Sequence, residues 1–203
     1  MTKIKICGLS RKCDIETANA LRLDYIGFVF YKKSKRYVSF EEAKELKSVL
    51  NKDIKAVGVF VDEPIENVAM LLNDGIIDIA QLHGNEDEDY IKELRLKADK
   101  PIIKAFCING EADVTKANES TADYVLLDAG MGCGNVFDWQ YINKINRPYF
   151  LAGGLAKENI EEAIKLFNPY ALDVSSGVET DGLKDKDKMA EFVSSIRKEK
   201  ENE

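Results

Sequence analysis

Eight alternations between short apolar segments and longer amphipathic segments restrict the fold of this chain more than any other feature. The short runs are rich in β-branched and aromatic residues, and the segments between them carry apolar residues at helical spacing. This order predicts βα units around a parallel sheet, because parallel strands need a crossover connection that is usually a helix. The expected strands are Lys3–Cys7, Tyr25–Phe30, Lys55–Val61, Ile77–Leu82, Ile102–Phe106, Tyr124–Leu127, Tyr149–Leu151 and Ala171–Val174. The expected helices lie near Asp14–Leu23, Phe40–Leu50, Ile65–Asn73, Glu86–Ala98, Glu111–Ser120, Trp139–Asn143, Lys157–Phe167 and Asp187–Lys198.

A count of eight such units predicts a single-domain (β/α)8 barrel, the TIM barrel, over residues 1–203. The chain is long enough for one buried core and too short for two ordinary catalytic domains. Ser39 and Glu42 are spaced as a capping box ahead of the second helix, and Pro64 suits a first helical turn. The sixth unit is the weakest, because the glycine-rich Gly130–Gly134 segment takes space that a longer helix needs. A doubly wound open sheet is the alternative, since βα order alone does not show that the sheet closes.

The composition argues against several classes of protein. Hydrophobic residues make up 45% of the chain and charged residues 32%, which is the range of globular domains. A formal net charge of -7 leaves no basic surplus for general nucleic-acid binding. No apolar run approaches the roughly 20 residues of a membrane span, and the first residues have the pattern of a strand rather than of a signal peptide. We therefore expect a cytoplasmic protein that binds neither nucleic acid nor membrane.

The four cysteines, Cys7, Cys13, Cys107 and Cys133, are widely spaced, and the chain has a single histidine. Neither a C-x-x-C pair nor a histidine cluster is present to complete a zinc site. The spacing therefore predicts neither a structural metal nor a disulfide, and it favours cysteines that act as small buried apolar side chains.

Polar residues and glycines directly after the expected strands are the candidates for an active site, because barrel enzymes build their sites at strand C-termini. These candidates are Cys7, the basic stretch Lys32–Arg36, Asp62, His83, Asp128, Gly153-Gly154 and Ser175-Ser176-Gly177. Glycines after the last two strands let backbone N–H groups approach a phosphate, and a helix start nearby adds favourable partial charge. Gly153, Gly154, Ser176 and Gly177 together predict a phosphate-binding cup for a small phosphorylated substrate.

Motifs that are spread over most of the chain resemble a single family. They are Lys5-Ile6-Cys7-Gly8, Gly27-Phe28-Val29-Phe30, Ser34-Lys35-Arg36, Gly58-Val59-Phe60-Val61, Gln81-Leu82-His83-Gly84, Leu127-Asp128, Phe137-Asp138-Trp139, Ala152-Gly153-Gly154-Leu155 and Asp173-Val174-Ser175-Ser176-Gly177-Val178-Glu179. In this order, from Lys3 to Glu179, they resemble the phosphoribosylanthranilate isomerases of tryptophan biosynthesis. Any one of these motifs alone would carry little weight, whereas the ordered set is highly specific.

The resemblance implies an Amadori rearrangement of N-(5-phosphoribosyl)anthranilate to 1-(2-carboxyphenylamino)-1-deoxyribulose 5-phosphate, the third step counted from chorismate. This chemistry needs no metal and no redox cofactor. By position, Asp128 resembles the general acid that protonates the ring oxygen, and Cys7 resembles the general base that removes the C2′ proton. Asp128 must then stay protonated above the usual aspartate pKa, whereas Cys7 must lose its proton, which a substrate iminium cation would favour.

The resemblance also implies the residues that bind substrate. Arg36 resembles the arginine that pairs with the anthranilate carboxylate, a task that a planar guanidinium performs better than a lysine. His83 is expected on the anthranilate side of the pocket, and Asp173 either holds a sugar hydroxyl or orients the loop after the last strand. Met131 and Cys133 depart from the usual loop of the family, and Ala152 stands where a serine often precedes the glycine pair.

Two other functions stay open on the sequence alone. The sister isomerase of histidine biosynthesis performs the same rearrangement on a substrate with two phosphates, but it has a carboxylate base where this chain has Cys7. A catalytically inactive barrel that serves as a binding module would lack the acid, the base or the arginine. Both a monomer and a homodimer fit the sequence, because an apolar outer helix face has the same pattern as core.

Overall fold

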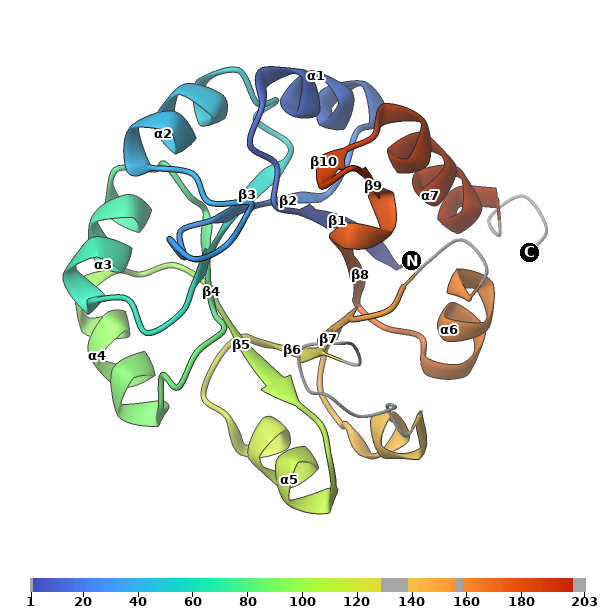
Figure 1. Ribbon diagram of the computed structural model, residues 1–203. Coiled ribbons are helices and arrows are strands. Elements are labelled where there is room, and N and C mark those ends of the chain that lie inside the picture. The colour runs from blue at the N-terminus through green and yellow to red at the C-terminus, as the bar shows by residue number, and fades with distance from the viewer. Residues whose placement is uncertain (1, 129–138, 156–158, 199–203) are drawn as a thin grey trace.

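The computed structural model describes residues 2–128, 139–155 and 159–198. Eight parallel strands surround a central axis, and helices cover them on the outside (Figure 1). The barrel strands are β1 (Lys3–Cys7), β2 (Tyr25–Val29), β3 (Lys55–Phe60), β4 (Ile79–Leu82), β5 (Ile102–Cys107), β6 (Tyr124–Asp128), β7 (Tyr149–Ala152) and β8 (Ala171–Val174). The helices are α1 (Lys12–Leu21), α2 (Phe40–Ser48), α3 (Ile65–Asn73), α4 (Glu88–Lys97), α5 (Glu111–Glu119), η1 (Trp139–Lys144), α6 (Ile160–Phe167), η2 (Ser176–Val178) and α7 (Lys186–Lys198).

The first strand pairs with two neighbours, and this pairing closes the sheet. Lys5 lies opposite Tyr25 of β2 on one side and opposite Asp173 of β8 on the other. The strands follow one another around the barrel in sequence order, so the predicted (β/α)8 barrel is confirmed and the open sheet is excluded. Each expected strand overlaps an observed strand, because the apolar β-branched runs are those that a parallel barrel buries on both faces.

Local signals in the sequence set several helix boundaries. The Ser39 hydroxyl accepts the backbone N–H of Glu42 at 3.2 Å, and the Glu42 carboxylate accepts the N–H of Ser39 at 2.7 Å. The predicted capping box of α2 is therefore confirmed. Pro64 occupies the N-cap position of α3, directly before its first helical turn. The weak sixth unit contains the 3-10 helix η1 in place of an α-helix, so the strand–helix pattern alone overstated the regularity of this unit.

Other expectations need correction. A two-stranded antiparallel hairpin, β9 (Glu179–Thr180) with β10 (Leu183–Lys184), lies between η2 and α7 and was not expected. Cys107 is disulfide-bonded, against the expectation that no disulfide forms, and its partner lies outside the described residues. Cys13 carries an exposed free thiol instead of a buried one. Spacing along the chain could not reveal these environments, because it does not say which segments meet in space.

Two apolar layers fill the molecule. The larger one packs the outer faces of the strands against the helices. The smaller one fills the barrel interior at the N-terminal ends of the strands, and it consists of Tyr25, Val57, Ile79, Ile103, Leu126, Phe150 and Ala171. An interior that is filled at this end leaves room for a cavity at the C-terminal ends. No helix in the described ranges is long and apolar enough to cross a membrane.

Candidate active site

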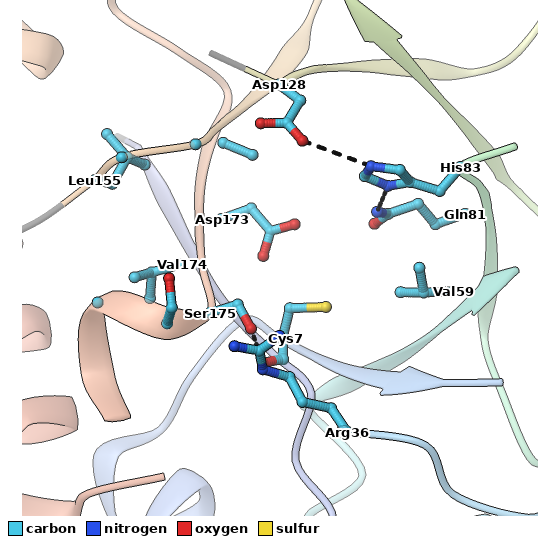
Figure 2. A pocket seen from close by; sticks show the side chains of 15 residues that line it. Cys7, Arg36, Val59, Gln81, His83, Asp128, Leu155, Asp173, Val174 and Ser175 are labelled. Atoms are coloured by element: carbon cyan, nitrogen blue, oxygen red, sulfur yellow. Dashed lines mark hydrogen bonds and ion pairs between the residues drawn. The ribbon is translucent and has the colours of Figure 1, made fainter. Parts of the chain in front are cut away.

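A cavity of about 500 Å³ opens at the C-terminal ends of the barrel strands, where barrel enzymes place their active sites. Asp128 and His83 lie on one side of it and Cys7 and Arg36 on the other, with Asp173 between them (Figure 2). The structure brings together every residue to which the sequence assigned a catalytic or binding role. The lining residues are Cys7, Arg36, Val59, Gln81, His83, Asp128, Ala152, Gly153, Gly154, Leu155, Asp173, Val174, Ser175, Ser176 and Gly177.

Asp62, a further candidate from the sequence, does not line the cavity. Its carboxylate accepts the backbone N–H of Asn85 at 2.6 Å, and its own backbone N–H donates to Glu86 at 2.8 Å. Asp62 therefore joins the loops after β3 and β4. In the basic stretch after β2, only Arg36 lines the cavity. The three lysines of this stretch, Lys32, Lys33 and Lys35, are exposed to solvent.

The acid candidate, Asp128, ends β6 and faces the only histidine of the chain. The Asp128 Oδ2 atom lies 3.7 Å from His83 Nε2. On the other side of the ring, Gln81 Nε2 lies 3.0 Å from His83 Nδ1 (Figure 2). Gln81 is almost fully buried in β4 and lies two residues before His83. Its amide therefore holds the imidazole ring at the Nδ1 side.

A buried ion pair lies beneath the cavity. Lys5 of β1 is completely buried, and its Nζ lies 2.5 Å from Asp173 Oδ2 and 2.9 Å from Gln81 Oε1. Burial opposes the ammonium form, but Asp173 and the neighbouring Cys7 more than offset this, so the pKa of Lys5 is raised. The second Asp173 oxygen, Oδ1, is buried and has no hydrogen-bond partner among the described residues. Asp173 itself also lines the cavity.

The base candidate, Cys7, ends β1 and carries a free thiol. Burial raises the pKa of this thiol, and attraction from Lys5 and Lys184 is not enough to reverse the effect. The described side chains around Cys7 therefore favour the thiol over the thiolate. The backbone carbonyl of Cys7 accepts the Ser175 hydroxyl at 3.0 Å, which ties the end of β1 to the loop after β8.

Arg36 is held by a carboxylate that the sequence reasoning missed as a site residue. Glu179 of β9 accepts hydrogen bonds from Arg36 Nε at 2.6 Å and from Nη2 at 2.8 Å. Burial opposes the Glu179 carboxylate, but hydrogen bonds from Arg36 and Lys184 outweigh it and lower the Glu179 pKa. A guanidinium has five N–H donors. Glu179 therefore occupies one edge of Arg36 and leaves the edge between Nη1 and Nη2 for another carboxylate.

The Gly153-Gly154 pair after β7 and the Ser176-Gly177 segment after β8 both form part of the cavity wall. Gly153 and Gly154 have φ values of 86° and 63°, a left-handed conformation that favours glycine. A Cβ atom on Gly154 would meet open space, whereas one on Gly177 would lie 2.5 Å from the carbonyl oxygen of Leu155. Gly177 therefore permits the close approach of the two loops, and Gly154 keeps the cavity wall free of side chains.

The departures at Met131 and Cys133 lie outside the described residues, as do the Phe137 and Asp138 parts of one motif. Ala152, the third departure, does line the cavity. Within the described ranges, no group of three His, Cys, Asp or Glu side chains is placed to hold a metal ion.

The closed barrel, with a carboxyl group, a thiol and an arginine around one mouth, defines a TIM-barrel enzyme. Residues 4–195 match the family described as N-(5'-phosphoribosyl)anthranilate (PRA) isomerase. The chain belongs to this family. It is an isomerase, and its reaction is the Amadori rearrangement of tryptophan biosynthesis.

Individual relatives support the same family over nearly full length. The N-(5'-phosphoribosyl)anthranilate isomerase of Thermoanaerobacter sp. (strain X514) is 45% identical over 204 residues, which cover 97% of this chain and 98% of the relative. A crystal structure of a phosphoribosyl anthranilate isomerase in complex with reduced 1-(o-carboxyphenylamino)-1-deoxyribulose 5-phosphate superposes with a TM-score of 0.85 at 34% identity, covering 98% of this chain and 100% of the other. Monomeric variants of the dimeric enzyme from Thermotoga maritima superpose with a TM-score of 0.84 at 34% identity, covering 97% and 99%.

Proposed function

We propose that Asp128 is the general acid and Cys7 the general base of the rearrangement. Asp128 donates its proton to the ribose ring oxygen while the C1′–O bond breaks, and the amine nitrogen lone pair forms the iminium C=N bond. Cys7 then removes the C2′ proton, and the electrons of that C–H bond neutralise the iminium to give an enaminol. The enaminol becomes the ketone as its C2′ hydroxyl gives a proton to the Asp128 carboxylate and C1′ takes one from the Cys7 thiol, so both side chains return to their starting states as acid and base. The observation that carries this assignment is that Cys7 and Asp128 face one cavity from opposite sides.

The order of the two proton transfers follows from the charges around Cys7. Since burial raises the pKa of the thiol, the thiolate needs a nearby positive charge. Ring opening creates that charge, because the iminium lies next to the C2′ proton that Cys7 removes. The acid step therefore favours loss of the thiol proton to solvent, and this activates the base.

The remaining polar groups bind the ends of the substrate. The free edge of Arg36 suits the anthranilate carboxylate, which it can bind through two parallel hydrogen bonds. Gly153, Gly154, Ser176 and Gly177 form the wall that suits the 5′-phosphate. Asp173 lines the cavity and suits a ribose hydroxyl, and His83 lies beside the acid, across the cavity from Arg36.

The oligomeric state, the partners and the cellular location of the enzyme belong to the same proposal. The dimeric enzyme from Thermotoga maritima and its monomeric variants support both a homodimer and a monomer as possible states of this chain. A small phosphorylated metabolite as substrate supports a cytoplasmic site of action, without nucleic acid or membrane as partner. The acid, the base and the arginine all line one cavity, which argues against an inactive binding module. A thiol at the end of β1 argues against the histidine-pathway isomerase, which has a carboxylate base there.

The assignment is tested with Cys7→Ala and Asp128→Asn. Positioned acids and bases typically contribute 10²–10⁴-fold, so each change is expected to lower kcat by about 10²-fold or more while KM changes little. The fluorescence change of freshly made phosphoribosylanthranilate measures the rate. Cys13→Ala is the matched control, since its thiol is free but does not line the cavity, and it should keep full activity. An active Cys7→Ala or Asp128→Asn enzyme with native circular dichroism would remove that residue from the mechanism.

A further inference from the structure

A chain of polar side chains crosses the floor of the cavity and ends at the acid. It runs from Lys5 through Gln81 and His83 to Asp128, and its members come from β1, β4 and β6 or directly follow them. The successive distances are 2.9 Å from Lys5 Nζ to Gln81 Oε1, 3.0 Å from Gln81 Nε2 to His83 Nδ1, and 3.7 Å from His83 Nε2 to Asp128 Oδ2. Lys5 and Gln81 are buried, so water does not compete for the contact between them, whereas His83 and Asp128 are partly exposed at the cavity.

The direction of each hydrogen bond in this chain follows from its first member. The Lys5 ammonium can only donate, so the Gln81 atom that faces it must be the accepting oxygen. The Gln81 amide nitrogen, which can only donate, then faces His83 Nδ1. A reversed amide would place an N–H donor against the buried ammonium, where that N–H would have no acceptor. The buried lysine therefore fixes the orientation of the glutamine.

The Gln81 amide in turn fixes the tautomer of the neutral His83 imidazole. Nδ1 accepts from Gln81, so it carries a lone pair, and the ring proton must be on Nε2. Nε2 is the atom that faces Asp128 Oδ2. The N–H group of His83 thus points at one oxygen of the acid, and a small movement would turn this contact into a hydrogen bond.

We propose that Lys5, Gln81 and His83 are positioning residues that keep the transferable proton of Asp128 on Oδ1. An N–H donor at Oδ2 favours Oδ2 as the carbonyl oxygen of the carboxylic acid, because this oxygen is the better acceptor, so the acid carries its proton on Oδ1. The opposite tautomer would present a lone pair at Nε2, which would accept a proton from Oδ2 and hold it between the two side chains. This inference rests on the proposed role of Asp128 as the acid.

The chain of Lys5, Gln81 and His83, which we call the relay, also acts during the proton transfer from Asp128. As the proton leaves Oδ1 for the ribose ring oxygen, negative charge develops on the carboxylate. The His83 N–H is already directed at Oδ2 and stabilises that charge without reorientation. No proton moves along the relay, so Lys5, Gln81 and His83 end the cycle in the states in which they began.

The tautomer can be measured directly, because the chain has one histidine. In protein labelled with ¹⁵N-histidine, a long-range ¹H–¹⁵N spectrum at about pH 8 reports which ring nitrogen carries the proton. We expect a protonated Nε2 and an unprotonated Nδ1 in the native protein. In Gln81→Glu, a carboxylate replaces the amide donor beside Nδ1, so the proton should move to Nδ1. A native protein with the proton on Nδ1, or a tautomer that does not respond to this change, would overturn the proposal.

Kinetics separate a positioning role from a structural one. Gln81→Glu should lower kcat by about tenfold or more with little change in KM, since Arg36 and the phosphate cup are untouched. A second pair of variants covers the possibility that a carboxylate at position 81 prevents folding. His83→Gln retains an N–H donor that can reach Asp128 and should keep kcat within about tenfold of the native enzyme, whereas His83→Met has no donor and should lose about 10²-fold. Equal losses in both variants would overturn the relay.

Failure of the relay can be told apart from failure of the proposed mechanism. If Asp128→Asn stays active while the spectrum shows protonated Nε2, the acid has been misassigned although the hydrogen-bond directions are right. If Asp128→Asn is inactive while Nδ1 carries the proton, Asp128 is the acid and the relay does not exist.

Discussion

The Cys7 thiol lies in an environment that opposes its charged form, although the proposed mechanism uses the thiolate. Burial raises its pKa, and the nearby ammonium groups of Lys5 and Lys184 offset this only in part. Lys5 is engaged by Asp173, and Lys184 is engaged by Glu179. The two cations are therefore largely neutralised by their own partners, and the substrate iminium is the unpaired charge that can stabilise the thiolate.

The raised pKa of Cys7 predicts an unusual pH dependence of alkylation. Iodoacetamide reacts with the thiolate, and a group with a raised pKa forms its thiolate only at higher pH. The inactivation rate of the free enzyme should therefore rise at higher pH than the reaction of free cysteine with the same reagent. Bound product should slow inactivation by covering the thiol. The measurement uses Cys13→Ala protein, in which the exposed competing thiol is absent, and peptide mass identifies Cys7 as the modified residue. A profile at or below that of free cysteine would contradict the raised pKa.

Among the loops and short elements, the hairpin β9–β10 joins the arginine loop to the last loop of the barrel. Glu179 from β9 holds Arg36, and Lys184 from β10 donates to both Glu179 and the backbone carbonyl of Ser175. The Ser175 hydroxyl in turn donates to the Cys7 carbonyl at 3.0 Å. A set of direct hydrogen bonds therefore connects Arg36 to the end of the strand that carries Cys7.

The loop after β7 allows a matched test of the phosphate cup. Gly154→Ala should cost about 1–2 kcal/mol of stability, because alanine is strained at a φ of 63°. The new methyl group also projects into open space at the cavity wall, so the affinity for product and for inorganic phosphate should fall. Gly75→Ala is the control, since Gly75 has a φ of 70°, faces open space and does not line the cavity. Calorimetry should show similar stability losses but a loss of phosphate affinity only for Gly154→Ala. Equal phosphate affinities in the two variants would place the cup elsewhere.

The sequence predicts elements and strand-end residues well, because both depend on local patterns. Apolar runs identify the strands, and the rule that sites follow strands finds Cys7, His83 and Asp128. Lys5 and Gln81 were missed as site residues because they lie inside strands, although a charged residue between Ile4 and Ile6 is a signal that a buried partner exists. The Arg36–Glu179 pair could not be predicted by spacing, since 143 residues separate its members.

At the scale of the whole molecule, the two ends of the barrel have different tasks. The C-terminal end holds the cavity, and the N-terminal end is closed by aromatic rings with a lysine over them. The Tyr170 hydroxyl is the centre of this closure, since it lies 3.0 Å from Lys3 Nζ, 2.9 Å from the Tyr25 hydroxyl and 3.4 Å from the Tyr124 hydroxyl. Closure is completed outside the barrel by Arg197 of α7, which donates to the carbonyls of Leu21 and Arg22 at the end of α1.

This division predicts that Tyr170→Phe lowers stability and leaves catalysis unchanged. The change removes only the hydroxyl, so the stacked ring remains while Lys3 and Tyr25 each lose a partner. A lost hydrogen bond in a partly buried site costs about 1–2 kcal/mol, which for a chain of this size lowers Tm by roughly 2–8 °C. Tyr124→Phe is the graded control, because its hydroxyl makes only the longest of the three contacts with Tyr170, and it should cost less. Both variants should keep the native kcat and KM, because the hydroxyls lie at the opposite end of the barrel from the cavity. A fall in kcat for Tyr170→Phe at a temperature where the protein is fully folded would show that the two ends are coupled through the strands.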